Sequence, residues 1–195
     1  MYSTDAVNWL SANYIYHTGL PGIDSQGFTG GITEGSNMPN HRLVGSGGNG
    51  AYKFGYSDDG ITWRQGRYNA TNSPLGQNLQ TGCTWYDVAY GYDGNATLPV
   101  SGRYVSVNFN GAASTYQFAY SDDGIGWIGV SYSLSALKQN WRSVTYGNGY
   151  FVALGQGRQA VSKDGKNWIA YNNFPSNAEP TDIEVANNRF VGLLS

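Results

Sequence analysis

Short runs in which apolar residues alternate with small or polar ones recur along the chain. Two clear examples are "RYVSVNF" at 103–109 and "YFVALGQ" at 150–156. A period of two is typical of half-buried β-strands, and Gly, Asn and Asp, which favour tight turns, bound these runs. No segment keeps the 3.6-residue period of an amphipathic helix. The pattern therefore predicts an all-β chain.

One acidic segment occurs four times. It reads "STDAVNW" at 3–9, "SDDGITW" at 57–63, "SDDGIGW" at 121–127 and "SKDGKNW" at 162–168. We call these segments acidic boxes 1 to 4. Their common pattern is S-x-D-G-x-x-W, with Ala6 in place of Gly in box 1. Repetition of this kind indicates a fold built from equivalent units.

A second element is also repeated. "TWYDVAYGYDG" at 84–94 matches "NWRSVTYGNG" at 140–149, and "PTDIEVANN" at 180–188 is a weaker copy. Each precedes a β-type run, so one unit comprises an inner strand, a second strand, a third strand ending in a box, and an outer strand. Four boxes give about 49 residues per unit, which is close to a four-stranded propeller blade. The sequence predicts a single-domain small β-propeller over residues 1–195, with about four blades.

The two ends of the chain are expected to complete one blade. Residues 181–195 supply its inner two strands, while the chain starts at the end of a third strand, directly before box 1. Pairing of these segments would close the ring. Only Met1 and Tyr2 precede Ser3, so a second chain that supplies the short strand is the alternative.

The residues of the boxes suit a turn. An Asp carboxylate can accept hydrogen bonds from backbone N–H groups two or three residues on, and Gly adopts positive φ easily. The Ser hydroxyl can satisfy another turn group, and the Trp covers the hairpin with apolar surface. Ala6 predicts either a different turn or a strained residue. The residues assigned to this structural role are Ser3, Asp5, Trp9, Ser57, Asp59, Gly60, Trp63, Ser121, Asp123, Gly124, Trp127, Ser162, Asp164, Gly165 and Trp168.

The acidic boxes resemble the Asp-box, or bacterial neuraminidase repeat, of sialidases and related β-propellers. That motif reads S-x-D-x-G-x-T-W, whereas here Gly follows Asp directly. The shorter form is similar to repeats in phage tail and other virion proteins. The resemblance extends to all four units. It implies that the boxes are structural and lie on the face away from a binding pocket.

Sialidase chemistry is not expected. The F/Y-R-I-P motif that carries the first sialidase arginine is missing from the sequence, and four blades are fewer than the six of that family. A general glycosidase needs two carboxylates at one cleft. Asp87 and Asp182 occupy equivalent inner-strand positions, with Ser143 between them. We expect them to bond to backbone or water, so no catalytic residue is predicted.

Composition and charge exclude several classes of protein. The net charge is −2 without a Lys/Arg run, so the electrostatic footprint of a nucleic-acid binder is missing. No apolar run approaches a membrane span, and the N-terminus lacks the pattern of a secretory signal. Cys83 is the single cysteine, and His17 and His41 do not form a recognised metal-ligand pattern. Neither a metal nor a cofactor is expected.

A ligand is expected at one end of the ring, where the inner strands start, by analogy with other propellers. The residues predicted for this surface are Trp85, Tyr86, Asp87, Trp141, Arg142, Thr181 and Asp182. The connecting segments 11–27, 68–80, 131–139 and 171–179 would flank it. Aromatic and polar side chains of this kind suit a sugar ring or a protein partner. For Trp85 and Trp141, the alternative is core packing between neighbouring blades.

The functional hypothesis is a non-catalytic virion component of a bacteriophage. It would contact neighbouring virion subunits or host-surface glycans, and it could form an oligomer. Its location would be the virion, after synthesis in the host cytoplasm, or alternatively an extracellular space reached without a recognisable signal peptide. Two other hypotheses remain open, namely a free-standing lectin and a small glycoside hydrolase.

Overall fold

The regular structure of the protein consists of β-strands. The computed structural model describes residues 3, 5–8, 10, 13–15, 32–35, 41–47, 53–66, 83–92, 97–99, 101–110, 112, 114–132, 136–172 and 179–195. These residues contain 15 strands and no helix, and therefore no helix that could span a membrane. The all-β prediction is confirmed.

The strands form four sheets, which we number as blades 1 to 4. Blade 1 contains β1 (Asn13–Ile15), β2 (Ile32–Gly35), β3 (Arg42–Ser46), β4 (Phe54–Ser57) and β5 (Thr62–Gln65). Blade 2 contains β6 (Trp85–Gly91), β7 (Arg103–Asn108), β8 (Phe118–Ser121) and β9 (Ile128–Val130). Blade 3 contains β10 (Trp141–Gly147), β11 (Tyr150–Gly155), β12 (Arg158–Ser162) and β13 (Ile169–Tyr171). Blade 4 contains β14 (Pro180–Ala186) and β15 (Arg189–Leu194).

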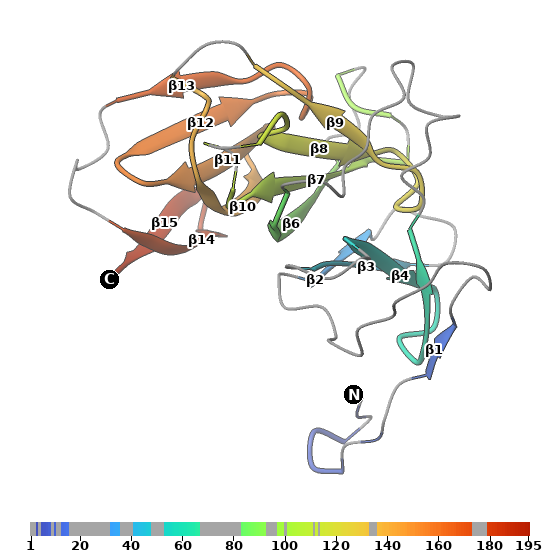
Figure 1. The fold of residues 1–195 in the computed structure, drawn as a ribbon. Coiled ribbons are helices and arrows are strands. Elements are labelled where there is room, and N and C mark those ends of the chain that lie inside the picture. Colours follow the sequence, from blue (N-terminus) through green and yellow to red (C-terminus); the bar gives the residue numbers. More distant parts are fainter. Residues whose placement is uncertain are drawn as a thin grey trace.

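The blades follow one another in chain order, and their inner strands lie side by side (Figure 1). The inner strands β2, β6, β10 and β14 are each in contact with the next in this series. Within blades 2 and 3 the strands are antiparallel and in sequential order. This meander matches the unit that the repeats predict.

The closure of the ring differs from the prediction. β1 adds to the outer edge of blade 1, where it pairs in parallel with β5, and blade 4 has two strands among the described residues. Figure 1 shows β1 and the C-terminal strand β15 at opposite ends of the series of blades. The edge of β5 is much nearer along the chain than that of β15, so pairing with it loses less loop entropy. Among the described residues, the two termini therefore do not complete one blade, and the blades form an open series.

The box tryptophans join neighbouring blades. Trp127 of blade 2 stacks on Phe54 of blade 1, with ring centroids 3.8 Å apart and planes 5° apart. Trp168 of blade 3 stacks on Phe118 of blade 2 at 4.1 Å and 5°. All four side chains are buried. The apolar surface of the box thus covers the preceding blade, and not only its own hairpin.

The acidic boxes form one type of turn. In box 2, Asp59 Oδ1 accepts hydrogen bonds from the N–H groups of Thr62 (2.6 Å) and Ile61 (2.8 Å) and from Ser57 Oγ (2.9 Å). These hydrogen bonds, first of all that from Thr62, lower the pKa of Asp59 to about 2. The same three contacts recur at Asp5, Asp123 and Asp164.

The residue after each box aspartate has a left-handed backbone. The φ angles of Gly60, Gly124 and Gly165 are 71°, 72° and 70°. Ala6 adopts the same conformation with φ of 60°, although its Cβ disfavours it. Of the two possibilities for Ala6, the structure therefore contains the strained residue in an unchanged turn. Trp9, the last residue of box 1, lies outside the described residues.

An arginine of the second strand binds box 3 to blade 1, and another binds box 4 to blade 2. Arg42 donates from Nε to Asp58 Oδ1 of its own blade (2.7 Å) and from Nη1 to the carbonyl oxygen of Asp123 in blade 2 (2.6 Å). Arg103 repeats this arrangement between blades 2 and 3. We call the contacts between blades 1 and 2 and between blades 2 and 3 the internal junctions. Each internal junction thus combines a ring stack with a charge-assisted hydrogen bond.

Candidate functional site

Three β-bulges shape the starts of the inner strands. The pairing register shifts between Trp85 and Asp87 in β6, and it shifts at the equivalent points of β10 and β14. A bulge adds one unpaired residue and turns its side chain away from the regular face. The bulged residues are Tyr86, Arg142 and Thr181. Tyr86 and Thr181 are exposed, and Arg142 is half-buried.

The bulged side chains of blades 2 and 3 meet around one aromatic ring. The ring of Tyr86 lies 5.2 Å from that of Phe109, and the Arg142 guanidinium lies 4.9 Å from the centre of the same ring. Arg142 Nη2 donates to Glu179 Oε2 at 3.2 Å. We call Tyr86, Phe109, Arg142 and Glu179 the rim cluster. It presents an aromatic face, a cation and an acid at the start of the inner strands.

Behind the rim cluster, two carboxylates share one hydroxyl. Ser143 Oγ lies 2.7 Å from Asp87 Oδ2 and 2.9 Å from Asp182 Oδ1. Asp87 also accepts hydrogen bonds from the N–H groups of Val88 (2.8 Å) and Val144 (2.9 Å). The network connects the inner strands of blades 2, 3 and 4, so it stabilises their side-by-side arrangement.

Asp87 binds a proton more readily than an ordinary carboxylate because it is buried. Burial raises the pKa of Asp87 to about 6, against the opposing effect of hydrogen bonds from Val144, Ser143 and Val88. The nearby charge of Asp182 raises it further. Ser143 has one hydroxyl hydrogen and can donate it to only one carboxylate at a time. A proton on Asp87 supplies the second hydrogen of this bridge below about pH 6.

The prediction that Trp85 and Trp141 belong to the binding surface is wrong. Both side chains are fully buried. Trp85 packs on Phe54 at 5.4 Å, and Trp141 packs on Phe118 at 5.3 Å. They precede the bulge, so they keep the regular direction and point at the preceding blade. The structure shows the alternative, core packing between neighbouring blades.

The remaining predicted site residues fall into two layers. Tyr86, Arg142 and Thr181 lie at the rim, and Asp87 and Asp182 form the network behind them. The connecting segments predicted to flank the site lie largely outside the described residues.

The repeated sequence elements do not single out Phe109 and Glu179. Phe109 ends the run "RYVSVNF", and its N–H donates to the Thr84 carbonyl oxygen at 2.8 Å, directly before β6. An aromatic residue at the end of a second strand was the available signal, because that end lies beside the start of the inner strand.

Metal chemistry has no centre in the described part of the chain. No group of three His, Cys, Asp or Glu side chains gathers there in a way that could hold an ion. The Cys83 thiol is buried, and burial raises its pKa. A thiol with a raised pKa is a poor nucleophile.

Comparison with known proteins gives relatives in structure only. No family model and no curated protein matches the chain. YCF48 from Cyanidioschyzon merolae superposes with a TM-score of 0.56 at 16% identity, covering 90% of this chain and 52% of that one. YCF48 bound to D1 peptide gives 0.50 at 15% identity, covering 83% and 46%. YCF48 is a β-propeller. The fold of this chain is a β-propeller.

The propeller prediction is thereby confirmed, and the chain spans about half the length of the YCF48 structures. A candidate glycosidase from Bacteroides thetaiotaomicron is also similar, with a TM-score of 0.47 at 13% identity over 86% of this chain and 61% of that one. Likeness at these levels concerns the fold and not the activity. In this fold, the rim cluster lies where the inner strands β6 and β10 begin.

Proposed function

We propose that this propeller is a non-catalytic recognition module that binds a polypeptide through the rim cluster. One observation carries the proposal: bulges in three successive inner strands turn Tyr86, Arg142 and Thr181 out at the same end of the propeller. Tyrosine and arginine are enriched among the residues that dominate binding energy at protein interfaces. The bulges present them without interrupting the pairing of the rest of each strand.

The chemistry of the rim cluster suits an extended polypeptide. Tyr86 is 41% exposed, and the guanidinium of the half-buried Arg142 lies against Phe109. Glu179 can accept hydrogen bonds from backbone N–H groups or pair with a cation. One of the similar propellers, YCF48, has been solved bound to a D1 peptide. That complex supports a peptide ligand for this fold.

The carboxylate pair argues for a structural role. Asp87 and Asp182 both hydrogen-bond to Ser143, and each accepts a backbone N–H bond from the residue that follows it. A glycosidase acid must instead face the glycosidic oxygen. Glycan cleavage that is lost in Asp87→Asn or Asp182→Asn would establish the hydrolase in place of the recognition module.

Glycan binding is the second candidate. The exposed ring of Tyr86 beside a cation and an acid could stack on a sugar and bond to its hydroxyls. The virion setting rests on the resemblance of the acidic boxes to phage repeats of the Asp-box type. In that setting the polypeptide is a neighbouring virion subunit, and the glycan lies on the host surface.

Selection from a random peptide library tests the proposal. Peptides selected on the wild-type chain should bind at least tenfold more weakly to Tyr86→Ala and Arg142→Ala, because each loses a central contact. Tyr171→Ala is the control, since Tyr171 is 44% exposed on the outer strand β13. Equal binding to all variants, or binding only to a glycan array, would reject a peptide site at the rim cluster.

A further inference from the structure

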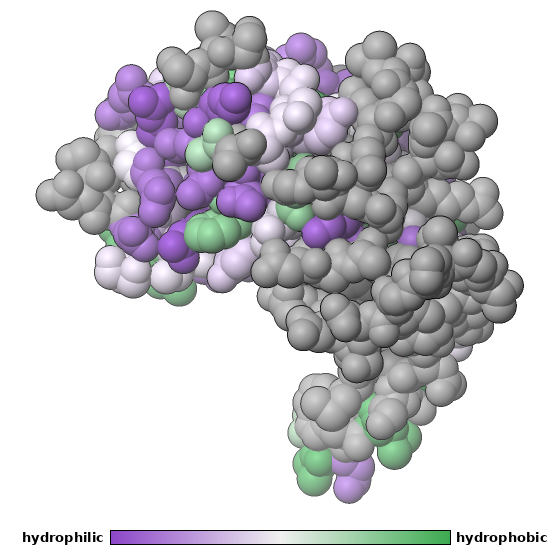
Figure 2. All heavy atoms as spheres, in the orientation of Figure 1, coloured by the Kyte–Doolittle hydropathy of each residue, from purple (hydrophilic) through white to green (hydrophobic). Residues whose placement is uncertain are grey.

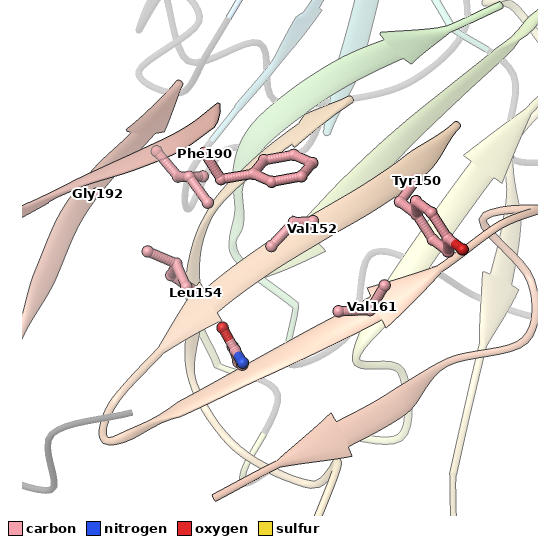
Figure 3. Close-up of a pocket in the computed structure, with 8 residues that line it drawn as sticks. Tyr150, Val152, Leu154, Val161, Phe190 and Gly192 are labelled. Carbon is pink, nitrogen blue, oxygen red and sulfur yellow. The ribbon is translucent and has the colours of Figure 1, made fainter. Parts of the chain in front are cut away.

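A cavity of about 310 Å³ lies between blades 3 and 4 (Figure 3). It is lined by Tyr150, Val152, Leu154, Gln159, Val161, Ile183, Phe190 and Gly192. Apart from Gln159 and the hydroxyl of Tyr150, this lining is apolar, and Tyr150 and Phe190 are more than one-third exposed. The two internal junctions between blades have an acidic box at the corresponding place.

The internal junctions define what a box contacts. Gly124 of box 3 lies so close to β3 of blade 1 that an added Cβ would be 2.8 Å from Val44 Cγ2. Gly165 of box 4 lies in the same way against Val105 of β7. The box tryptophan then stacks on the phenylalanine that starts the third strand of that blade. One valine and one third-strand residue thus form a seat for box 3 and for box 4.

Blade 3 has this seat without a box among the described residues. Counting from the strand pairing, Val152 is the equivalent of Val44, and Gln159 is the equivalent of Phe54. Both residues line the cavity, and Figure 3 shows Val152 pointing into it. We call the cavity the open seat.

Box 1 is a box without a seat. Its described hydrogen bonds all run between Ser3, Asp5, Val7 and Asn8. Val7 is 77% exposed, and Leu10, just after the box, is 57% exposed. Figure 1 shows this segment projecting away from the blades, and the same segment carries apolar atoms on its surface in Figure 2. The turn is preformed and needs no folding on binding.

We propose that box 1 of a second copy of this chain occupies the open seat. The sequence before the box agrees with this register. Tyr2–Ser3 repeats the Tyr–Ser pairs that end β4 and β8, and in blade 1 these residues pair with Val44 and Leu43. The equivalent places on β15 are Val191 and Phe190. The outer edge of β15 has no strand beside it among the described residues, so it can receive these backbone groups.

The partner is a second copy because the chain's own box 1 is held elsewhere. β1, which follows box 1 closely, pairs with β5 over Asn13, Tyr14 and Ile15 at the outer edge of blade 1. That edge and β15 lie at opposite ends of the series of blades (Figure 1). A second copy can place its box in the seat while this pairing stays intact. Two copies that exchange boxes would form a closed, symmetric pair.

The open seat is built for a weaker contact than the internal junctions. Gln159 stands where the internal junctions have Phe, Pro180 where they have Trp, and Tyr150 where they have Arg. A seat with Gln exposes less apolar surface when it is empty. In the proposed complex, the methyl group of Ala6 would require a shift of Val152, as an added Cβ on Gly124 would require of Val44. The predicted association is therefore reversible, and Ala6→Gly should strengthen it.

Engineered cysteines test the contact between the two copies. In a Cys83→Ala background, Ala6→Cys and Val152→Cys chains are mixed and oxidised. The mixture should give a disulfide-linked species of twice 21.1 kDa that neither variant forms alone. Ala6→Cys mixed with Thr181→Cys, at the opposite end of the strands, is the control. No linked species, or a double variant that links only within one chain at high dilution, would overturn the proposal.

The mass in solution provides a second test that does not depend on cross-linking. At about 100 μM, wild type should contain two or more copies by light scattering, and Asp5→Ala and Val152→Asp should be single chains. Asp5→Ala serves where Val152→Asp fails to fold, because the described part of box 1 bonds only to itself. Ala6→Gly should associate at roughly tenfold lower concentration. Wild type that stays a single chain would overturn the proposal, whatever the rim cluster binds.

Discussion

The ring of Phe118 lies flat on the ring of Trp168, with 4.1 Å between their centroids and 5° between their planes, although the two residues belong to different blades. Trp168 ends the acidic box of blade 3, while Phe118 starts the third strand of blade 2. The box is therefore a joint between blades as well as a turn. Stability and blade order depend on the same repeated segment.

Removal of this stack should be among the most damaging single changes. Phe118→Ala is expected to lower the free energy of unfolding by about 3–5 kcal/mol, because it leaves a cavity between Trp141 and Trp168. Urea unfolding followed by tryptophan fluorescence measures this loss. Tyr171→Ala, at an exposed position, should change the same free energy by less than about 1 kcal/mol. A loss below that level at Phe118 would contradict the role of the stack.

Two glycines separate backbone strain from crowding. Gly149 and Gly165 have φ of 79° and 70°, so alanine strains the backbone at both, by about 1 kcal/mol. An added Cβ has no neighbour within 4 Å at Gly149 but meets Val105 at Gly165. Gly165→Ala should therefore lose roughly 1–3 kcal/mol more than Gly149→Ala in chemical unfolding. Equal losses would mean that the box does not pack tightly on blade 2.

The box carboxylate should matter as a hydrogen-bond acceptor. Asp164 accepts from Ser162 Oγ and from the N–H groups of Lys166 and Asn167. Asp164→Ala should lower the free energy of unfolding by roughly 1–2 kcal/mol, since these donors lose their partner near the surface. Asp164→Asn keeps one acceptor oxygen and should lose about half as much. Thermal and urea unfolding of both variants would distinguish them, and identical losses would point to charge instead.

The raised pKa of Asp87 predicts a specific dependence of stability on pH. Its pKa is about 6 in the folded chain and 3.8 as the ordinary value, so the folded state binds the proton more tightly. The stabilisation is complete below about pH 4 and is lost as the pH rises through about 6. Relative to Asp87→Asn, wild type should lose about 2 kcal/mol of unfolding free energy between pH 4 and pH 7. Unfolding curves at both values check this, and a constant difference would rule out the raised pKa.

Many of the strands and turns could be predicted from the sequence because each blade repeats their pattern. The Val-containing runs located β7, β11 and β15, and the S-x-D pattern located the turns after the third strands. The register shifts could not be predicted, because a bulge depends on how two strands pair and not on the type of one residue. For the same reason Trp85 and Trp141 were assigned to the surface, although they lie one residue before the shift.

The open end of the propeller was predicted least well. The repeat correctly predicts that β14 and β15 are the first two strands of a blade. The expectation that the N-terminal segment completes this blade also required a third strand beside β15, which the described residues do not contain. The segment "NYI" at 13–15 carries no repeated signature, so its pairing with β5 had no signal in the sequence. Phe109 was missed because its importance comes from Tyr86 and Arg142, which approach it from two other strands.

The bulges also place the exposed binding residues and the residues that stabilise the inner strands at different positions. The backbone pairing of each inner strand skips its bulged residue, namely Tyr86, Arg142 or Thr181. Replacement of these residues therefore leaves the regular backbone pairing in place. The residues next to them hold the inner strands in place, because they are buried or hydrogen-bonded in the carboxylate network. The three positions can therefore diversify together, in natural variants or in a designed library, and give one frame many specificities.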